Sequence, residues 1–465
     1  MPVPQLPAPM IDLRPRLGAA VAKLEQRSPY AAVLLSSREG ISIEVEQKEE
    51  KISQLPLSAG VVLTCLANGV LTERSLPGFE PGRLEQAVRA MYQELGVAPK
   101  RTPGSDEPVA ARDFATAGKA PARQLSLEDK LERCRDIQRR LTRIDPRVVN
   151  ARVAYAEHSE TSVFRSRSQD LAQEVVRLRI SAMAILSQDG QVRYDWLGKG
   201  GTGGWEMLDY TDEELNSVVE GAARMFSAER IEPAEYTVVT GPGVSGVLAH
   251  ESFGHGVETD LFPKERARAF DYLGRKVGSP LVDIVDDPSL DGGYASYFFD
   301  DEGMLSEPTT IVDKGIFRRG ISDMLSARTL DLHRTANGRR QDFTRKPYAR
   351  MSNTFFGPGT TSVEDLFAQV DHGVFLNRWV NGMEDPQGWG IQITCHYGQE
   401  IVHGKLTGRV FSPVSLSGYV PQVLDTIRGV GPLVQMDQGT CGKGHKEYMP
   451  NSSGGPHLLL QVRLG

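Results

Sequence analysis

Residues 246–256 read Gly-Val-Leu-Ala-His-Glu-Ser-Phe-Gly-His-Gly, which places histidines at positions 250 and 255 and a glutamate directly after the first. A hydrolytic zinc site needs neutral imidazoles, a third protein ligand and an open position for water. The metal lowers the pKa of that water toward ~7, and a neighbouring carboxylate can take its proton as it attacks a carbonyl. His250, His255 and the intervening Glu251 therefore indicate a metal-dependent hydrolase.

The spacing of the two histidines has a structural consequence. Residues four apart on a regular α-helix differ in direction by about 40°, whereas His250 and His255, five apart, differ by roughly 140°. A straight helix cannot present both imidazoles to one ion. We therefore expect either a π-type extra residue or a helix end before His255. Gly254 and Gly256 flank that histidine and make either distortion easier.

A third metal ligand must come from elsewhere in the chain. The candidates by residue type are Glu258, Asp260, Cys395, His396, Cys441 and His445. Cys441 lies in a glycine-bounded segment, Gln438-Gly-Thr-Cys-Gly-Lys-Gly, whose backbone can approach a metal closely, and a thiolate is a good zinc ligand. Cys395 lies in an alternating apolar run that favours packing in a sheet. Most lone cysteines are inert, so the residues alone leave the choice open.

Length and composition limit the class of protein. A chain of 465 residues is too long for one hydrophobic core, and 40% hydrophobic with 24% charged residues argues against disorder. A net charge of −7 gives no general attraction for nucleic acid, so no nucleic-acid partner is expected. No secretion signal or long apolar run is present, and we expect no membrane partner. Four scattered cysteines without a CxxC pair indicate a reducing compartment, and the cytoplasm is expected.

Turn signals and periodicity predict the first elements of the chain. A turn-like break at Arg38-Glu39-Gly40 favours a β-hairpin over residues 31–46. A second hairpin is expected from Val61 to Arg74, with Asn68-Gly69 at its turn. Residues 82–95 carry apolar side chains on one helical face and predict a helix.

Two further helices are indicated by capping boxes. Ser126 followed by Asp129, and Thr211 followed by Glu214, each open a stretch with an apolar helical stripe. The glycine-rich run 198–204 lacks the features of a phosphate-binding loop and favours a flexible loop.

These patterns divide the chain near residue 233 into two domains, 1–233 and 234–465. Within the first, residues 97–125 are rich in Pro, Ala, Gly and charge and are expected to form a mobile linker or loop. Beyond the boundary, short β-type runs alternate with turn residues. The expected fold class is α+β: an N-terminal α/β domain with hairpins and helices, and a mostly β C-terminal domain with a curved or barrel-like sheet that carries the metal site.

The C-terminal half resembles the TldD/PmbA family of metallopeptidases. The stretches that carry this resemblance are Gly246–Asp260 with its H-E-x-x-x-H core, Asn337-Gly-Arg-Arg340, Arg350-Met-Ser-Asn-Thr354 and Gly439-Thr-Cys441-Gly-Lys443. Their order and separations fit the family, and the five-residue histidine spacing is the family's own pattern. The resemblance extends less specifically over the rest of the chain.

The resemblance implies a zinc-dependent peptidase. It implies zinc held by His250, His255 and Cys441, with Glu251 as general base. It also implies unfolded peptide substrates that bind in extended form by pairing with a strand, which is tolerant of sequence. A dimer enclosing a central cavity is expected, either a homodimer or a heterodimer with a family paralogue that lacks the zinc residues. The segment 376–390 is longer than the resemblance leads us to expect.

Two competing interpretations come from other classes of protein. The first is a non-catalytic modulator or binding protein with a structural zinc site, which a fourth protein ligand would favour. Glu251 argues against it, because a structural site needs no carboxylate beside the metal. The second is a thiol enzyme with Cys441 as nucleophile and His445 as base, which leaves the two histidines at 250 and 255 unexplained.

Overall fold

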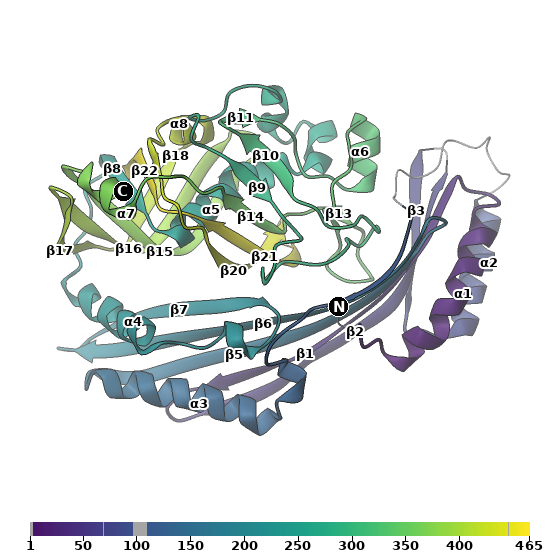
Figure 1. The fold of residues 1–465 in the computed structure, drawn as a ribbon, viewed down its shortest axis with the longest axis horizontal. Helices are drawn as coiled ribbons and strands as arrows, with labels where there is room; N and C mark the ends of the chain where they lie inside the picture. Colours follow the sequence, from purple (N-terminus) through teal and green to yellow (C-terminus); the bar gives the residue numbers. More distant parts are fainter. Residues whose placement is uncertain (1–2, 68, 96–108, 445) are drawn as a thin grey trace.

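A computed structural model describes residues 3–67, 69–95, 109–444 and 446–465. It confirms the α+β class. A long sheet from the N-terminal part of the chain lies along one side of the molecule, and the C-terminal part covers one of its faces (Figure 1). Helices cover the opposite face, with α3 along the sheet and α1 and α2 at one end (Figure 1).

The N-terminal sheet has seven strands in the order β3-β2-β1-β5-β6, and β6 pairs with both β4 and β7. Its strands are β1 (Tyr30–Val45), β2 (Glu50–Ala67), β3 (Val70–Pro77), β4 (Ala110–Ala115), β5 (Val148–Arg165), β6 (Gln169–Gln188) and β7 (Gln191–Thr202). The helices are α1 (Ala8–Leu24), α2 (Pro81–Glu94), α3 (Leu127–Ile144) and α4 (Asp212–Arg224). Residue 233 lies between α4 and β8, and the two-domain division there stays a prediction.

Alternation along β1 explains how the sheet is covered on both faces. Val33 and Leu35 belong to the hydrophobic cluster of α1 and α2. The intervening Leu34 belongs to another cluster, together with Phe299 and Met324 from the C-terminal part. Because successive side chains of a strand point to opposite faces, a strand with apolar residues at consecutive positions is buried on both sides.

The hairpin predicted over residues 31–46 is wrong, because this segment is one strand with a bulge between Arg38 and Gly40. A Cβ atom at Gly40 would lie 2.1 Å from the carbonyl oxygen of Glu157 on β5. The glycine therefore serves a close approach between strands rather than a turn. The second hairpin is confirmed by the pairing of β2 with β3, although Asn68 of its turn lies outside the described residues.

The capped helices are confirmed, and two loop predictions are corrected. Ser126 with Asp129, and Thr211 with Glu214, form reciprocal capping boxes at α3 and α4. Residues 96–108 of the expected linker lie outside the described residues, but β4 pairs in parallel with β6 over its full length. Residues 198–202 of the glycine-rich run are the end of β7 rather than a flexible loop. Gln438 of β20 (Gln435–Lys443) leaves no room for side chains at Gly198 and Gly200.

The C-terminal part contains a closed barrel, as the sequence predicted. Five strands form the ring β15-β8-β22-β18-β16, which closes because β15 pairs with β16; β17 and β19 attach to it. These strands are β8 (Ala234–Thr240), β15 (His372–Asp385), β16 (Gly390–Val402), β17 (Lys405–Phe411), β18 (Val414–Tyr419), β19 (Gly429–Val430) and β22 (Leu458–Leu464).

A second C-terminal sheet has the order β11-β10-β9-β14-β21-β20. Its strands besides β20 are β9 (Ile284–Asp286), β10 (Thr309–Asp313), β11 (Ile316–Phe317), β14 (Asn353–Phe356) and β21 (Lys446–Gly455). The remaining elements are α5 (Pro242–Phe253), α6 (Met324–Leu330), α7 (Val363–Ala368), α8 (Val420–Asp425) and the short pair β12 (Gly338–Arg339) and β13 (Tyr348–Ala349).

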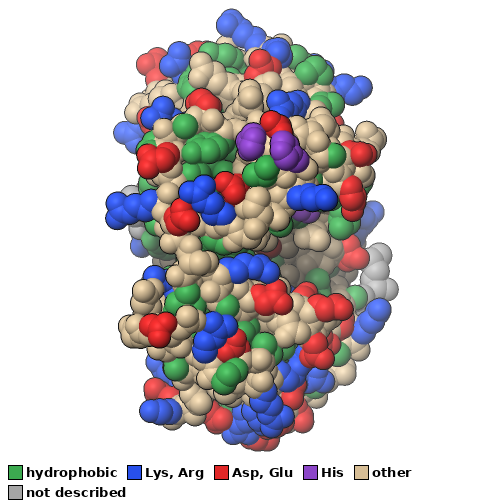
Figure 2. All heavy atoms as spheres, turned by 90° about the vertical axis from the view of Figure 1, so that its left-hand side faces the viewer, with side chains coloured by type: hydrophobic (Ala, Val, Ile, Leu, Met, Phe, Trp, Pro, Cys, Tyr) green, Lys and Arg blue, Asp and Glu red, His purple; other side chains and the backbone are tan. Residues whose placement is uncertain are grey.

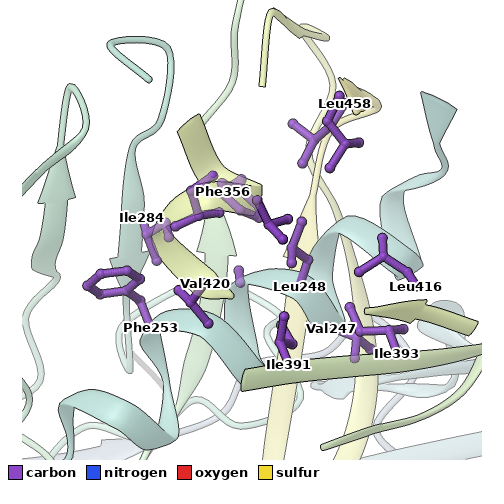
Figure 3. Packing of buried hydrophobic residues seen from close by; sticks show 14 of the residues in the cluster. Val247, Leu248, Phe253, Ile284, Phe356, Ile391, Ile393, Leu416, Val420 and Leu458 are labelled. Atoms are coloured by element: carbon purple, nitrogen blue, oxygen red, sulfur yellow. The ribbon is translucent and has the colours of Figure 1, made fainter. Parts of the chain in front are cut away.

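Helix α5 is buried where the barrel meets the second sheet. Val247 and Leu248 pack with Ile391 and Ile393 of β16, while Phe253 packs toward the other side of the cluster (Figure 3). Every residue from Val244 to Phe253 is buried, including the polar ones. A helix enclosed in this way is held by its neighbours on all sides, so its polar side chains are fixed in position.

One face of the molecule carries charges of both signs among polar and apolar side chains (Figure 2). At the end of the molecule shown in Figure 2, Lys and Arg alternate with Asp and Glu, and no large area of a single sign forms. Within the described residues, none of the helices combines the length and the apolar composition that a membrane crossing requires.

Candidate metal centre

The end of α5 brings both histidines to one place. The helix stops at Gly254, which has φ −100° and ψ −78°, and a 3₁₀ turn from His255 to Val257 follows. A Cβ atom at Gly254 would lie 2.0 Å from Sδ of Met351 and 2.2 Å from the carbonyl oxygen of His250. Only glycine fits this tight exit. The predicted helix end before His255 is therefore confirmed.

His250, His255 and Cys441 converge in the described part of the chain. One ligand atom from each lies within 4.8 Å of the others. The two imidazole rings are 5.1 Å apart and nearly perpendicular, at 86°. Sγ of Cys441, from β20, lies 2.9 Å from Nε2 of His255. The helix end and an edge strand thus supply an N₂S set of atoms facing one point.

Electrostatics favour the thiolate form of Cys441. Burial raises the pKa of its thiol, but the charge of His255, and then that of His250, outweighs burial and holds the pKa well below its ordinary value. Burial lowers the pKa of His255, but Cys441 and Glu258 raise it well above its usual range. A metal ion binds such a group by replacing its protons, so two imidazoles and a low-pKa thiolate fit zinc well.

A shell of polar groups orients the histidines. Oε2 of Glu258 lies 3.5 Å from Nδ1 of His255. Lys443 and Arg350 hold this carboxylate at 3.0 and 3.2 Å. On the other side, the side-chain amide of Asn451 lies 3.2 Å from Nδ1 of His250. A carboxylate at Nδ1, as at His255, fixes the imidazole orientation in metal sites and leaves the far ring nitrogen for the metal.

The three side chains line a cavity of about 650 Å³ together with Glu251. Glu251 projects from α5 toward β15, where a Cβ atom at Gly382 would lie 2.6 Å from its Oε1. Gly382 therefore leaves the space that the carboxylate occupies. Gly439 and Thr440 of β20 and Trp379 of β15 also line the cavity. Its two walls are thus strands, and α5 forms its floor.

Several residues considered as third ligands lie elsewhere. Cys395 is buried in β16, and burial raises the pKa of its thiol to about 12. His396 packs against Tyr194 outside the cavity. Asp260 pairs with Lys443 at 2.5 Å, and Glu258 contacts a histidine, as described above. His445 lies outside the described residues.

Three features of the site were not predicted from the sequence: Asn451, Glu384, and the contact of Arg350 with Glu258. Nothing in their spacing connects them to residues 250–255, although the stretch around Arg350 and the segment 376–390, which contains Glu384, were noted for other reasons. Glu384 lies within the long segment 376–390 and lines the cavity. Burial raises the pKa of its carboxyl well above the ordinary value; the charge of His255 lowers it and that of Glu251 raises it further.

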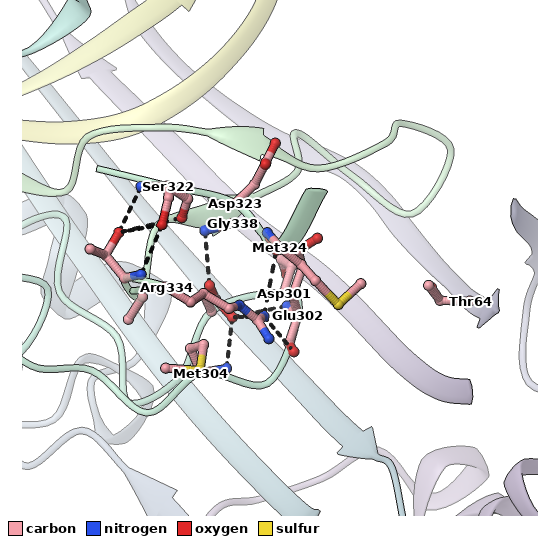
Figure 4. Close-up of polar contacts among 12 residues, drawn as sticks. Thr64, Asp301, Glu302, Met304, Ser322, Asp323, Met324, Arg334 and Gly338 are labelled. Carbon is pink, nitrogen blue, oxygen red and sulfur yellow. Dashed lines mark hydrogen bonds and ion pairs between the residues drawn. The ribbon is translucent and has the colours of Figure 1, made fainter. Parts of the chain in front are cut away.

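A second buried group of charges lies beyond Asp260. Asp260, Glu302 and Asp323 line a separate cavity of about 420 Å³. Arg334 donates to the backbone carbonyl of Glu302 at 2.8 Å and lies 3.5 Å from its carboxylate and 3.7 Å from that of Asp300 (Figure 4). Burial raises the pKa of Glu302 to about 8. The charge of Arg334 lowers this pKa, and the charges of the neighbouring carboxylates raise it.

Comparisons with known proteins show which family the chain resembles. Residues 120–227 match the PmbA/TldA metallopeptidase central domain, and residues 233–463 match the PmbA/TldA metallopeptidase C-terminal domain. A metalloprotease of Methanothermobacter thermautotrophicus is 28% identical over 453 residues, which cover 96% of this chain and 97% of that protein. A zinc metalloprotease TldD homologue of Saccharolobus solfataricus is 26% identical over 228 residues, about half of each chain (49% and 50%).

The fold is shared with a solved structure from Thermotoga maritima, described as a candidate modulator of a DNA gyrase. It has a TM-score of 0.80 at 18% identity and covers 98% of this chain and all (100%) of that one. With the two consecutive domain matches and the full-length relative, this chain belongs to the PmbA/TldD family of metallopeptidases, which are hydrolases of peptide bonds.

Proposed function

We propose that the protein is a zinc peptidase in which His250, His255 and Cys441 hold the metal. The convergence of these three side chains beside Glu251 in one cavity supports this most directly. Three protein ligands are typical of catalytic zinc sites, which keep a further position open. When bound, zinc supplies a Lewis acid that activates water and polarises the scissile carbonyl.

Glu251 acts as the general base in this proposal. It follows a ligand histidine on α5 and lines the cavity, where Gly382 leaves room for its carboxylate. One carboxylate oxygen accepts the proton of the attacking water and then donates it to the nitrogen of the leaving amine. Glu258 keeps Nδ1 of His255 in place during these steps, because Lys443 and Arg350 anchor it.

The substrate proposed is an unfolded or extended peptide. β20 is the edge strand of its sheet, and its residues Gly439 and Thr440 line the cavity beside Cys441. An edge strand offers unpaired backbone groups, with which an extended peptide can form main-chain hydrogen bonds regardless of its sequence. A folded domain could not present its backbone in this way.

Two alternatives give different experimental results. A non-catalytic modulator would bind zinc without turnover; the description of the Thermotoga maritima protein names a modulator of a DNA gyrase. A thiol peptidase would use Cys441 as nucleophile with His255, which contacts its sulfur, as base. The thiol enzyme retains activity after the metal is removed, whereas the zinc enzyme loses it.

The test is elemental analysis together with cleavage of an unfolded polypeptide. We expect about one zinc per chain and cleavage that a chelator abolishes and added zinc restores. His250→Ala and Cys441→Ser should both lose zinc and activity, while Cys395→Ser, a buried thiol in the barrel, should keep both. Unchanged zinc in the Cys441→Ser protein would remove Cys441 from the ligand set.

The expected assembly is a homodimer or a heterodimer with a family paralogue, as the family resemblance implies. Light scattering after size-exclusion chromatography, alone and with a paralogue that lacks the zinc residues, tests this expectation. A monomer under both conditions would contradict it.

A further inference from the structure

The carboxylate of Glu384 occupies a defined place beside the metal ligands. Gly382, Glu384 and their partners on β16 follow a regular register, so the two residues share one face of β15. Gly382 faces Glu251, and a Cβ atom at Gly256 would lie 2.4 Å from Oε1 of Glu384. Glu384 therefore lies two residues along β15 from Gly382, which contacts the proposed general base, and it lies next to the turn that carries His255.

Among the described residues, no Lys or Arg forms an ion pair with this carboxylate. Both of its oxygens are buried, and neither has a hydrogen-bond partner among the described residues. The N–H of Gly256 is nearby but lacks the geometry of a hydrogen bond. A carboxylate removed from water without a partner is costly, so such a group calls for a specific explanation.

The Lys and Arg side chains of the site are engaged elsewhere. Lys443 contacts Glu258 and Asp260, and Arg350 contacts Glu258 and the carbonyl oxygen of Cys441. Glu384 is also not part of the cluster of metal-binding atoms formed by the described residues. A cationic group that enters the cavity can reach this carboxylate, because Glu384 lines it.

We propose that Glu384 is a subsite for a primary ammonium group of the peptide substrate, supplied by either its α-amino terminus or a lysine side chain. An ammonium carries three N–H donors and a positive charge, which suits a buried carboxylate. This inference rests on the proposed peptidase function. It makes Glu384 a specificity-determining residue: an α-ammonium at this position directs cleavage close to the amino terminus, and a lysine directs cleavage close to that lysine.

The test compares Glu384→Gln with Asp385→Asn in the zinc-loaded protein. Both substitutions replace a carboxylate by an amide, but Asp385 is the exposed neighbour on the opposite face of β15 and does not line the cavity. The substrates are four peptides of otherwise identical sequence: with a free amino terminus, acetylated, acetylated with one lysine, and acetylated with that lysine replaced by norleucine. kcat/KM is measured for each.

We expect Glu384→Gln to lower kcat/KM by about 10- to 100-fold for peptides that carry the recognised ammonium, with little change for those without one. A lower kcat/KM for the peptide with a free amino terminus shows that Glu384 binds the α-ammonium group. A lower kcat/KM for the lysine peptide alone shows that it binds the lysine side chain. An equal loss on all four peptides, or no loss on any, overturns the inference.

A binding measurement separates this inference from the peptidase proposal. Calorimetry with the Glu251→Gln protein and the same peptides reports affinity without turnover, and adding Glu384→Gln should weaken binding of the ammonium peptides only. If the wild-type protein cleaves no peptide, the proposed function fails. If it cleaves them but adding Glu384→Gln to Glu251→Gln leaves the affinity for every peptide unchanged, only the Glu384 subsite fails.

Discussion

Nε2 of His255 lies 2.9 Å from Sγ of Cys441, although 186 positions separate the two residues in the chain. His255 follows the end of a helix, and Cys441 lies on the edge strand of a sheet. Neither position is reactive on its own. Together they form a charged pair, in which each residue shifts the pKa of the other toward its ionised form against the effect of burial.

This pairing predicts selective chemistry in the metal-free protein. Cys441 should react with iodoacetamide at neutral pH, because the charge of His255 offsets burial and keeps the pKa of the thiol low. Burial raises the pKa values of the thiols of Cys65, Cys134 and Cys395 to about 12. Mass spectrometry should find about one label per chain, at Cys441, and zinc should slow labelling at least ~10-fold. Equal labelling of the other cysteines in the folded protein would contradict this.

The Glu251→Gln variant distinguishes two roles of Glu251: general base, or a residue that only orients a ligand histidine. If Glu251 is the general base, the variant should keep its zinc and fold but lose about 10²–10⁴-fold in turnover, because only proton transfer is removed. If Glu251 merely orients a histidine, zinc affinity should fall by roughly 10- to 100-fold instead. Zinc content and the rate on an unfolded polypeptide distinguish the two. Full occupancy with undiminished cleavage would exclude both roles.

The Gly254→Ala variant tests whether the backbone conformation at the end of α5 is needed to place His255 in the metal site. A Cβ atom there would meet Met351 and the carbonyl of His250 at about 2 Å, so the turn that carries His255 must shift. We expect a loss of zinc affinity and a destabilisation on the order of 1–3 kcal/mol. Gly82→Ala is the matched control, since Gly82 lies in α2 with open space around it. The control should be neutral or slightly stabilising. Normal zinc binding in the Gly254→Ala protein would show that the exit tolerates a side chain.

Glu302 makes the stability of the protein depend on pH. Its pKa is raised by burial from 4.5 to about 8, so the folded state keeps a proton that the unfolded chain releases above about pH 4.5. The stabilising contribution is complete below pH 4.5 and is lost as the pH rises to about 8. Glu302→Gln stays neutral and should remove most of this loss, on the order of a few kcal/mol. Urea unfolding at pH 5, 6.5 and 8 measures it. Exposed Glu307→Gln is the control, and identical slopes in both variants would contradict the assignment.

Local sequence determined those parts of the structure that depend on short-range chemistry. Ser126 with Asp129 and Thr211 with Glu214 start helices because their hydrogen bonds close within one turn. The five-residue spacing of His250 and His255 required an irregularity, and Gly254 marked its place. These inferences needed no knowledge of distant residues.

Tertiary structure decided the features that depend on neighbours far along the chain. Gly40 resembles a turn residue, yet it lies within a strand because the carbonyl of Glu157 on β5 approaches it. The glycine run of β7 resembles a loop, yet it pairs with β6 and packs against Gln438. Glycine occurs both where another backbone approaches closely and where a turn needs a positive φ. Only the surrounding chain shows which of the two reasons applies at a given position.

The site divides in the same way. The sequence by itself predicted His250, Glu251 and His255 as candidate site residues, because they lie close together in one segment. Residue types alone left the third ligand open, and only the family resemblance implied Cys441. The sequence did not reveal Glu384 in the same cavity, because Cys441 and Glu384 lie on strands placed there by sheet pairing. Ligand atoms must come within a few ångströms of one another, and in a chain this long only the packed sheets and barrel fix distances on that scale.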